Sequence, residues 1–178
     1  MDAVATKLDE LIAAVRDVVR RNHDARGTGA SVADLLRNYV NDPELLSREQ
    51  LAPDPSGYRQ HILHVEPDGS FSVVALVWLP GQATPIHDHV SWCVVGVYRG
   101  DEHETTYELR NGERDLHLVV TGEHVNRNGS IASLVPPGDI HCVRNGGNDV
   151  AVSLHIYGAD IRKLGCSIRR RYDYGVKS

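Results

Sequence analysis

From Tyr58 onward, apolar residues recur with a period of two, and this pattern constrains the fold of the 178-residue chain more than any other feature. Short segments of this kind follow one another without a helical stretch between them. We expect strands at 58–65, 71–79, 93–98, 104–110, 116–120, 131–135, 141–144 and 150–157. Asp68-Gly69 and Asn111-Gly112 lie between such segments and are strong signals for hairpin turns. Short strands joined in this way predict an antiparallel sandwich or barrel.

The N-terminal third has a helical period instead. One apolar stripe at helical spacing consists of Leu8, Leu11, Ile12, Val15, Val18 and Val19. Residues 23–29 are polar and include Gly27 and Gly29, so we expect them to end this helix. Ser31 is a suitable N-cap for a second helix, and Asp42-Pro43 marks the start of a short third one.

Length and composition indicate a single soluble domain. The chain is 41% hydrophobic and 24% charged, as is usual for a globular protein. We expect residues 1–52 to form a helical cap and residues 58–178 to form a β-barrel. The net charge is −5, so the chain lacks the excess of basic residues that a general nucleic-acid-binding protein needs, and no nucleic-acid partner is expected. The longest apolar run, 73–79, is far shorter than the ~20 residues that span a bilayer, so no membrane partner is expected.

The first residues and the cysteines predict the compartment. Charges are spread through residues 1–20, which therefore lack the apolar core of a signal peptide, and the acidic residues among them argue against a transit peptide. Cys93, Cys142 and Cys166 are irregularly spaced and show no paired zinc-binding pattern. We therefore expect a cytoplasmic protein with free thiols.

His87-Asp88-His89 lies between two expected strands and points to a metal. Residues at i and i+2 of an extended segment face the same side, so both histidines can bind one ion while Asp88 faces away. By itself such a pair is more often a surface or core feature than a metal site. The chain has ten histidines, but a count does not separate ligands from surface residues.

The residues around this pair resemble the cupin superfamily. The first cupin motif is matched in spacing by Gly81, His87, His89, Cys93 and Gly100. Residues 136–141 (PPGDIH) and Asn145 resemble the second motif, although its leading glycine, Gly129, lies one residue early. The resemblance implies a mostly β protein with a small jelly-roll barrel, and a metal held by His87, His89 and His141.

Cys93 stands where most cupins have a glutamate ligand. Without that carboxylate, three neutral imidazoles leave a divalent metal its full +2 charge and, in octahedral geometry, about three open positions. Such a site suits an anionic substrate that itself binds the metal. A thiolate supplies both the missing charge and the electron density for binding O2.

Two segments resemble the cysteine dioxygenase-like thiol dioxygenases, a branch of the cupins. Residues 81–100 (GQATPIHDHVSWCVVGVYRG) are similar to the metal motif of that family, and residues 152–157 (VSLHIY) to its second signature. The likeness runs from about Tyr58 to Tyr157. It implies Fe(II), O2 and the conversion of a small thiol to its sulfinate. It also implies a catalytic relay of Ser153, His155 and Tyr157, which alternate along one strand and so share a face.

Cys93 has two interpretations. In the animal enzymes of the family the matching cysteine forms a thioether with the tyrosine that matches Tyr157, so the resemblance admits a catalytic crosslink. The alternative is a small buried apolar residue, a common role for a free cysteine.

The substrate carboxylate needs a cation or an amide. In the family this group is an arginine in one branch and a glutamine in another. Arg59 and Gln60 are adjacent and face opposite sides of a strand. Gln60 facing the metal resembles the branch associated with 3-mercaptopropionate, and Arg59 would indicate L-cysteine. The further arginine of the glutamine branch has no clear position here.

Two other functions remain open at this stage. One is a metal-binding sensor cupin without catalysis, which needs the three histidines but not the relay. The other is a cupin dioxygenase or isomerase that acts on a non-thiol substrate, although such enzymes usually keep the acidic ligand that Cys93 replaces. The sequence allows a monomer or a homodimer.

Overall fold

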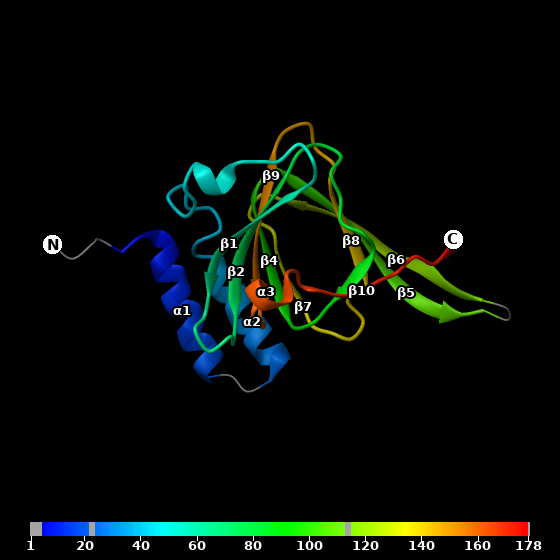
Figure 1. Cartoon of the computed structure of the whole chain (residues 1–178), viewed down its shortest axis with the longest axis horizontal. Coiled ribbons are helices and arrows are strands. Elements are labelled where there is room, and N and C mark those ends of the chain that lie inside the picture. Colours follow the sequence, from blue (N-terminus) through cyan, green and yellow to red (C-terminus); the bar gives the residue numbers. More distant parts are fainter. Residues whose placement is uncertain (1–4, 22–23, 113–114, 178) are drawn as a thin grey trace.

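The computed structural model describes residues 5–21, 24–112 and 115–177, which form two mostly antiparallel sheets (Figure 1). The first sheet has the order β1 (Arg59–Val65), β2 (Ser72–Trp78), β9 (Ala151–Tyr157), β4 (Cys93–Arg99) and β7 (Ile131–Leu134). The second has the order β10 (Ile168–Arg171), β3 (His87–His89), β8 (His141–Asn145), β5 (Asp101–Asn111), β6 (Leu116–Arg127) and β11 (Val176–Lys177). The two sheets form the barrel, and the β5–β6 hairpin projects from it on the side away from the helices.

Each expected strand is present, but the alternating pattern underestimates the length of the β5–β6 hairpin. β6 continues to Arg127, well beyond the expected end at residue 120, because polar residues extend the ladder with β5. Three short strands lie outside the expected set. β3, β10 and β11 contain mainly polar residues, so they show no apolar alternation and owe their pairing to the neighbouring strands.

The helical region differs from the prediction. α1 (Lys7–Arg21) is present, but the second helix, α2 (Ala25–Leu36), begins well before Ser31. The Asp24 carboxylate caps α2 by accepting from the Gly27 amide at 2.8 Å. The prediction of a third helix at Asp42-Pro43 is wrong. Asp42 instead accepts from the Glu44 amide at 2.9 Å, and this turn competes with a helix. A single 3-10 turn, η1 (Glu49–Leu51), follows.

Close packing between α2 and the first sheet explains why the helix includes a glycine, a residue that usually ends helices. A Cβ on Gly29 would lie 2.6 Å from Ser133 Oγ of β7, so the glycine lets the helix approach the sheet closely. A second close contact joins α2 to β4, where a Cβ on Gly96 would lie 2.8 Å from Leu36 Cδ2. Tertiary packing therefore outweighs the low helix propensity of glycine here.

The period of two divides the first sheet into a helix-facing side and a barrel-facing side. On β2, Val73, Ala75 and Val77 pack in the cluster that includes Leu11 and Leu36 of the helices. The alternate residues Val74, Leu76 and Trp78 pack inside the barrel with Cys93 and Tyr157. The helices thus cover one face of the sheet, and the other face is free to line a site.

Tight turns bring the two histidine motifs together. Gly81 and Gly138 have φ values of +80° and +100°, in the region that favours glycine. The Gly81 amide donates to the Asn145 carbonyl at 3.0 Å, which joins the first motif to the second. Among the described helices, none has the length and apolar character needed to cross a bilayer.

Candidate metal centre

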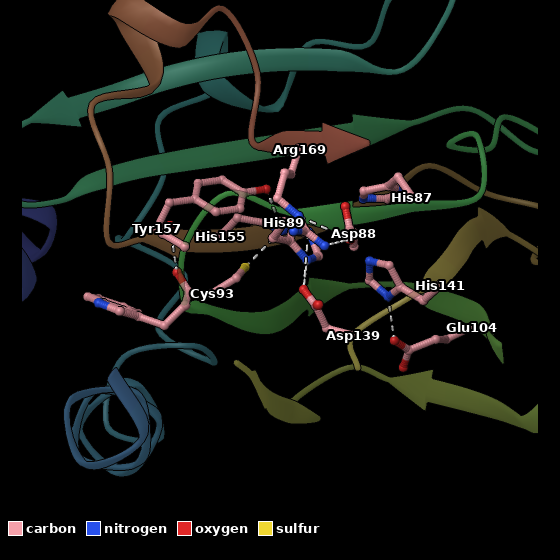
Figure 2. A network of polar contacts seen from close by, with 12 residues as sticks. His87, Asp88, His89, Cys93, Glu104, Asp139, His141, His155, Tyr157 and Arg169 are labelled. Atoms are coloured by element: carbon pink, nitrogen blue, oxygen red, sulfur yellow. Dashed lines mark hydrogen bonds and ion pairs between the residues drawn. The ribbon is translucent and has the colours of Figure 1, made fainter. Parts of the chain in front are cut away.

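Three buried histidines converge at the mouth of the barrel (Figure 2). His87 and His89 lie on β3, and His141 lies on β8 directly opposite His87. The side chains alternate so that both β3 histidines face inward, as expected for an i, i+2 pair. One nitrogen from each ring lies within 4.8 Å of the other two, which is close enough for one ion to bind all three.

Each ring donates its Nδ1 hydrogen to a fixed acceptor outside the cluster. The pairs are His87 with the Pro85 carbonyl (2.9 Å), His89 with Asp139 (2.9 Å) and His141 with Glu104 (2.6 Å). Since carbonyl and carboxylate oxygens only accept, this sets the tautomer, and Nε2 of each ring keeps a free lone pair. Outer hydrogen bonds of this kind orient histidine ligands and raise their basicity.

Burial and hydrogen bonds shift the pKa values of several groups in the cluster. Burial, reinforced by the neighbouring His141, lowers the pKa of His87 to about 3. Burial alone would raise the pKa of Asp139 and Glu104, but the hydrogen bonds from His89 and His141 lower it. Three imidazole donors, two of them backed by carboxylates, fit a divalent transition-metal ion.

Asp88 faces away from the cluster, as expected, and anchors the C-terminal segment. Its carboxylate accepts from the Tyr172 hydroxyl at 2.8 Å and from the Arg169 guanidinium, whose Nε lies at 3.1 Å. β10 also pairs with β3. The segment after the barrel is therefore tied to the strand that carries two of the three histidines.

Ser153, His155 and Tyr157 form a continuous hydrogen-bonded chain along β9. The Tyr157 hydroxyl lies 3.0 Å from His155 Nδ1, and Ser153 Oγ lies 2.8 Å from His155 Nε2. Burial lowers the pKa of His155 well below its ordinary value and raises the pKa of Tyr157 well above it. The imidazole is therefore neutral and the phenol is protonated near pH 7.

Cys93 lies directly opposite Tyr157 in the β4–β9 ladder. Its sulfur is 4.0 Å from His155 Nδ1, the same atom that the Tyr157 hydroxyl contacts. The thiol is fully buried, and burial raises its pKa well above the ordinary value. The position fits both the crosslink and the apolar packing role.

A pocket with about 420 Å³ of empty space, part of it open to solvent, lies beside the histidines. Gln60 and Tyr58 line it together with Tyr157, whereas Arg59 is exposed and lies outside this lining. The Gln60 amide donates to the Gly165 carbonyl at 3.4 Å. Gln60 is thus the member of the Arg59–Gln60 pair that faces the histidines.

The chain is similar in sequence to proteins of one known family. A family model described as cysteine dioxygenase type I matches residues 1–166. The chain belongs to the cysteine dioxygenase type I family. Cysteine dioxygenase type 1 of Danio rerio is 26% identical over 128 residues, which are 71% of this chain and 63% of that relative. The match therefore spans less than two thirds of the relative's length.

Two solved structures are also similar to this chain. A Cupin 2 conserved barrel domain protein from Salinispora arenicola is 18% identical, with a TM-score of 0.45 over 67% of this chain and 92% of its own. A protein with a double-stranded beta-helix domain from Klebsiella pneumoniae is 21% identical, with a TM-score of 0.46 over 65% of this chain and 92% of its own. This member of the family is mostly β, with two sheets and an N-terminal helical region, as expected.

The groups that support the histidines were not predicted from the sequence. Glu104 reaches His141 across the β5–β8 ladder, and no local spacing links the two. Asp139 had a signal, because it stands two residues before His141 within the second motif. The cavity wall formed by Cys166, Ser167 and Ile168 was also missed, because the chain returns to β3 only in the folded protein.

Proposed function

We propose that the protein is an iron(II)-dependent thiol dioxygenase that oxidises a small carboxylic thiol to the sulfinic acid with O2. The observation that carries this proposal is the combination of three converging histidines, no acidic residue at the Cys93 position, and the intact Ser153–His155–Tyr157 chain. Membership of the cysteine dioxygenase type I family supports it.

His87, His89 and His141 would hold the iron through Nε2. Bound iron(II) would supply a charge that favours the thiolate and open positions for both reactants. The hydrogen bonds of the three imidazoles set their tautomers, and no acidic ligand accompanies them, so the anionic substrate would provide the compensating charge. Holding thiol and O2 at one centre replaces a bimolecular encounter by a positioned one.

Gln60 would bind the substrate carboxylate. Its place on the cavity wall, with Arg59 exposed, favours 3-mercaptopropionate over L-cysteine as the preferred substrate. The neighbouring Tyr58 lines the same cavity and packs against Trp78, with ring centroids 4.6 Å apart. This aromatic contact fixes the start of β1 and so helps to hold Gln60 in place.

Tyr157 would donate a hydrogen bond to the reacting oxygen or to the substrate. Its phenol is protonated and lines the same cavity as the three histidines. His155 and Ser153 hold it in place, so the group acts without reorganisation.

We also propose a cytoplasmic location. Cys93, Cys142 and Cys166 are free in the structure, as thiols are in a reducing compartment.

Iron-loaded protein supplied with 3-mercaptopropionate, L-cysteine or cysteamine tests the function. We expect O2 uptake equal to sulfinate formed, fastest with 3-mercaptopropionate and slowest with cysteamine, which lacks a carboxylate. The His141→Ala variant, loaded in parallel, is the matched control. If none of the three thiols causes O2 uptake, the proposal is contradicted.

A further inference from the structure

A second cavity reaches the same histidines from a different set of strands. It has about 360 Å³ of empty space, part of it open to solvent, and its wall comes mainly from β4, β5, β7 and β8. The pocket lined by Gln60 and Tyr157, called the substrate pocket below, is built mainly from β1, β2, β3 and the C-terminal segment. His141, Val143 and His155 line both spaces. The proposed function uses only the substrate pocket.

The second cavity presents a mainly apolar surface. Its apolar side chains are those of Val95, Val97, Ile131, Ala132, Leu134 and Val143. Val95 and Ala132 lie directly opposite each other in the β4–β7 ladder, so the two strands contribute neighbouring apolar groups to the same wall. Apolar cavities stay dry and take up apolar molecules such as xenon. The wall therefore favours a small apolar ligand.

The polar groups of the second cavity disfavour an anion. Glu104 accepts from His141 Nδ1 at 2.6 Å through one oxygen and from the Asn126 amide at 3.1 Å through the other, the pattern of a carboxylate. The other acid of the wall, Glu102, is 1% exposed and offers the cavity little polar surface. Among the described residues of this wall, none is a lysine or an arginine. An anionic thiol would meet a like charge here and no cationic partner.

The exposure of the lining residues separates the base of each space from its mouth. In the substrate pocket the histidines are buried, whereas Gln60 and Ile168 are half-buried. A thiol held by Gln60 would therefore lie in the mouth, between solvent and the histidines. In the second cavity His141 and His155 are buried and Ala132 of β7 is half-buried. This cavity thus connects solvent with the histidines by a way that the thiol does not occupy.

We propose that the second cavity is the binding and entry site for O2, separate from the mouth through which the thiol enters. O2 is small, uncharged and apolar, so it enters an apolar space that repels an anion. With two entrances, a bound thiol does not block the second reactant. That O2 is the ligand rests on the proposed function, but the uptake of a small apolar gas at this site does not.

Xenon binding to the zinc-loaded protein tests the site without turnover, with xenon in place of O2. We expect saturable, xenon-dependent shifts in the methyl NMR signals of Val95, Val97 and Ala132, both with and without 3-mercaptopropionate. No shifts in these methyls, or shifts confined to Leu76 of the substrate pocket, would overturn the proposal. Loss of the shifts when the thiol is added would also overturn it, because the two spaces would not be separate.

Filling the cavity tests its role in turnover. Ala132→Phe places a ring at the half-buried end of the wall. We expect it to abolish the xenon shifts and to lower kcat/KM for O2 about 10-fold, a barrier about 1.4 kcal/mol higher, with an unchanged KM for the thiol. Ala132→Leu adds less volume and should have a smaller effect of the same kind. Wild-type O2 kinetics in a variant that no longer binds xenon would overturn the proposal.

Ile168→Phe is the matched control, since Ile168 lines the substrate pocket and not the second cavity. We expect it to raise the KM for the thiol and to leave both the xenon shifts at Val97 and kcat/KM for O2 as in the wild type. If it impairs the use of O2 as much as Ala132→Phe does, the entrances are not separate and the proposal fails.

The two readouts distinguish this inference from the proposed function. If the wild type oxidises no thiol, the proposed function fails, and the xenon experiment still decides whether the cavity takes up an apolar gas. If the wild type is active but binds no xenon beside Val97, only the assignment of the second cavity fails.

Discussion

At the residue scale, the site separates groups that would hold a metal from groups that would act on a substrate. The three histidines point their free nitrogens at one another, and their outer nitrogens are held by Pro85, Asp139 and Glu104. Tyr157 shares their cavity but hydrogen-bonds to His155 instead. The two functions can therefore be removed separately.

Tyr157→Phe removes the hydroxyl and keeps the ring. We expect an unchanged iron content and a fall in kcat of about 100-fold, the low end of the range for a positioned proton donor. Metal analysis and O2 uptake measure both, with Tyr174→Phe as the control outside the cavity. Wild-type turnover in the variant would show that the Tyr157 hydroxyl does not act on the substrate, and turnover in neither protein would favour the metal-binding sensor.

Asp139→Ala leaves the Nδ1 hydrogen of His89 without its acceptor. We expect metal affinity to fall about 10- to 100-fold, and less in Asp139→Asn, which keeps an acceptor but loses the charge. Competition with a metal chelator measures the affinity, and Asp149→Ala, at an exposed acid, is the control. Equal affinities in the wild type and both Asp139 variants would show that Asp139 does not support the ligand.

Cys93 and Tyr157 can be tested for a thioether directly. The bond would replace the thiol hydrogen and one ring hydrogen, with O2 as the oxidant. Protein incubated with iron and O2 would then yield a linked peptide lighter by two hydrogens than the sum of its parts, and Cys93→Ser would not. If mass spectrometry finds only unlinked peptides, the buried packing role of Cys93 stands.

At the element scale, the contact between α2 and β4 depends on a residue without a side chain. A Cβ on Gly96 would lie 2.8 Å from Leu36 and 3.0 Å from Val40. We expect Gly96→Ala to lower the free energy of unfolding by about 1–3 kcal/mol, and Leu36→Ala by about 2–5 kcal/mol. Because the smaller Leu36 side chain makes room, the double variant should lose less than the sum. Urea unfolding measures all three, and strict additivity would contradict direct contact.

At the scale of the whole molecule, a partly buried ion pair joins the helical region to the barrel. Arg16 of α1 donates to both oxygens of Glu66 at the end of β1, at 2.7 and 3.0 Å. Glu66 is 6% exposed, and the bond from Arg16 is the main cause of its lowered pKa. A carboxyl with a lowered folded-state pKa stabilises the protein above its ordinary pKa, and this contribution is lost as the pH falls.

Arg16→Gln tests this connection. At pH 7 we expect the free energy of unfolding to fall by about 1–2 kcal/mol, since the pair is only partly shielded from water. The difference from the wild type should shrink below pH 4.5, the ordinary pKa of the carboxyl. Urea unfolding across this range measures it, with the exposed Arg21→Gln as control. If the difference in the free energy of unfolding between variant and wild type does not change with pH, the loss of stability comes from packing of the Arg16 side chain and not from its charge.

Local patterns were sufficient for much of this protein. The period of two placed the main strands because alternate residues of a half-buried strand must differ in polarity. The spacing of His87 and His89 put both on one face for the same reason. These features depend on neighbours in the chain, so the sequence by itself determined them.

Only the tertiary structure decided what meets across the barrel. The acceptor for His141 and the choice of Gln60 over Arg59 at the cavity both join residues from different strands. The close packing of α2 on the sheet at Gly29 was likewise decided only there, against the low helix propensity of glycine. Such pairings depend on ladder register and on packing at a distance along the chain, which one-dimensional periodicity does not contain.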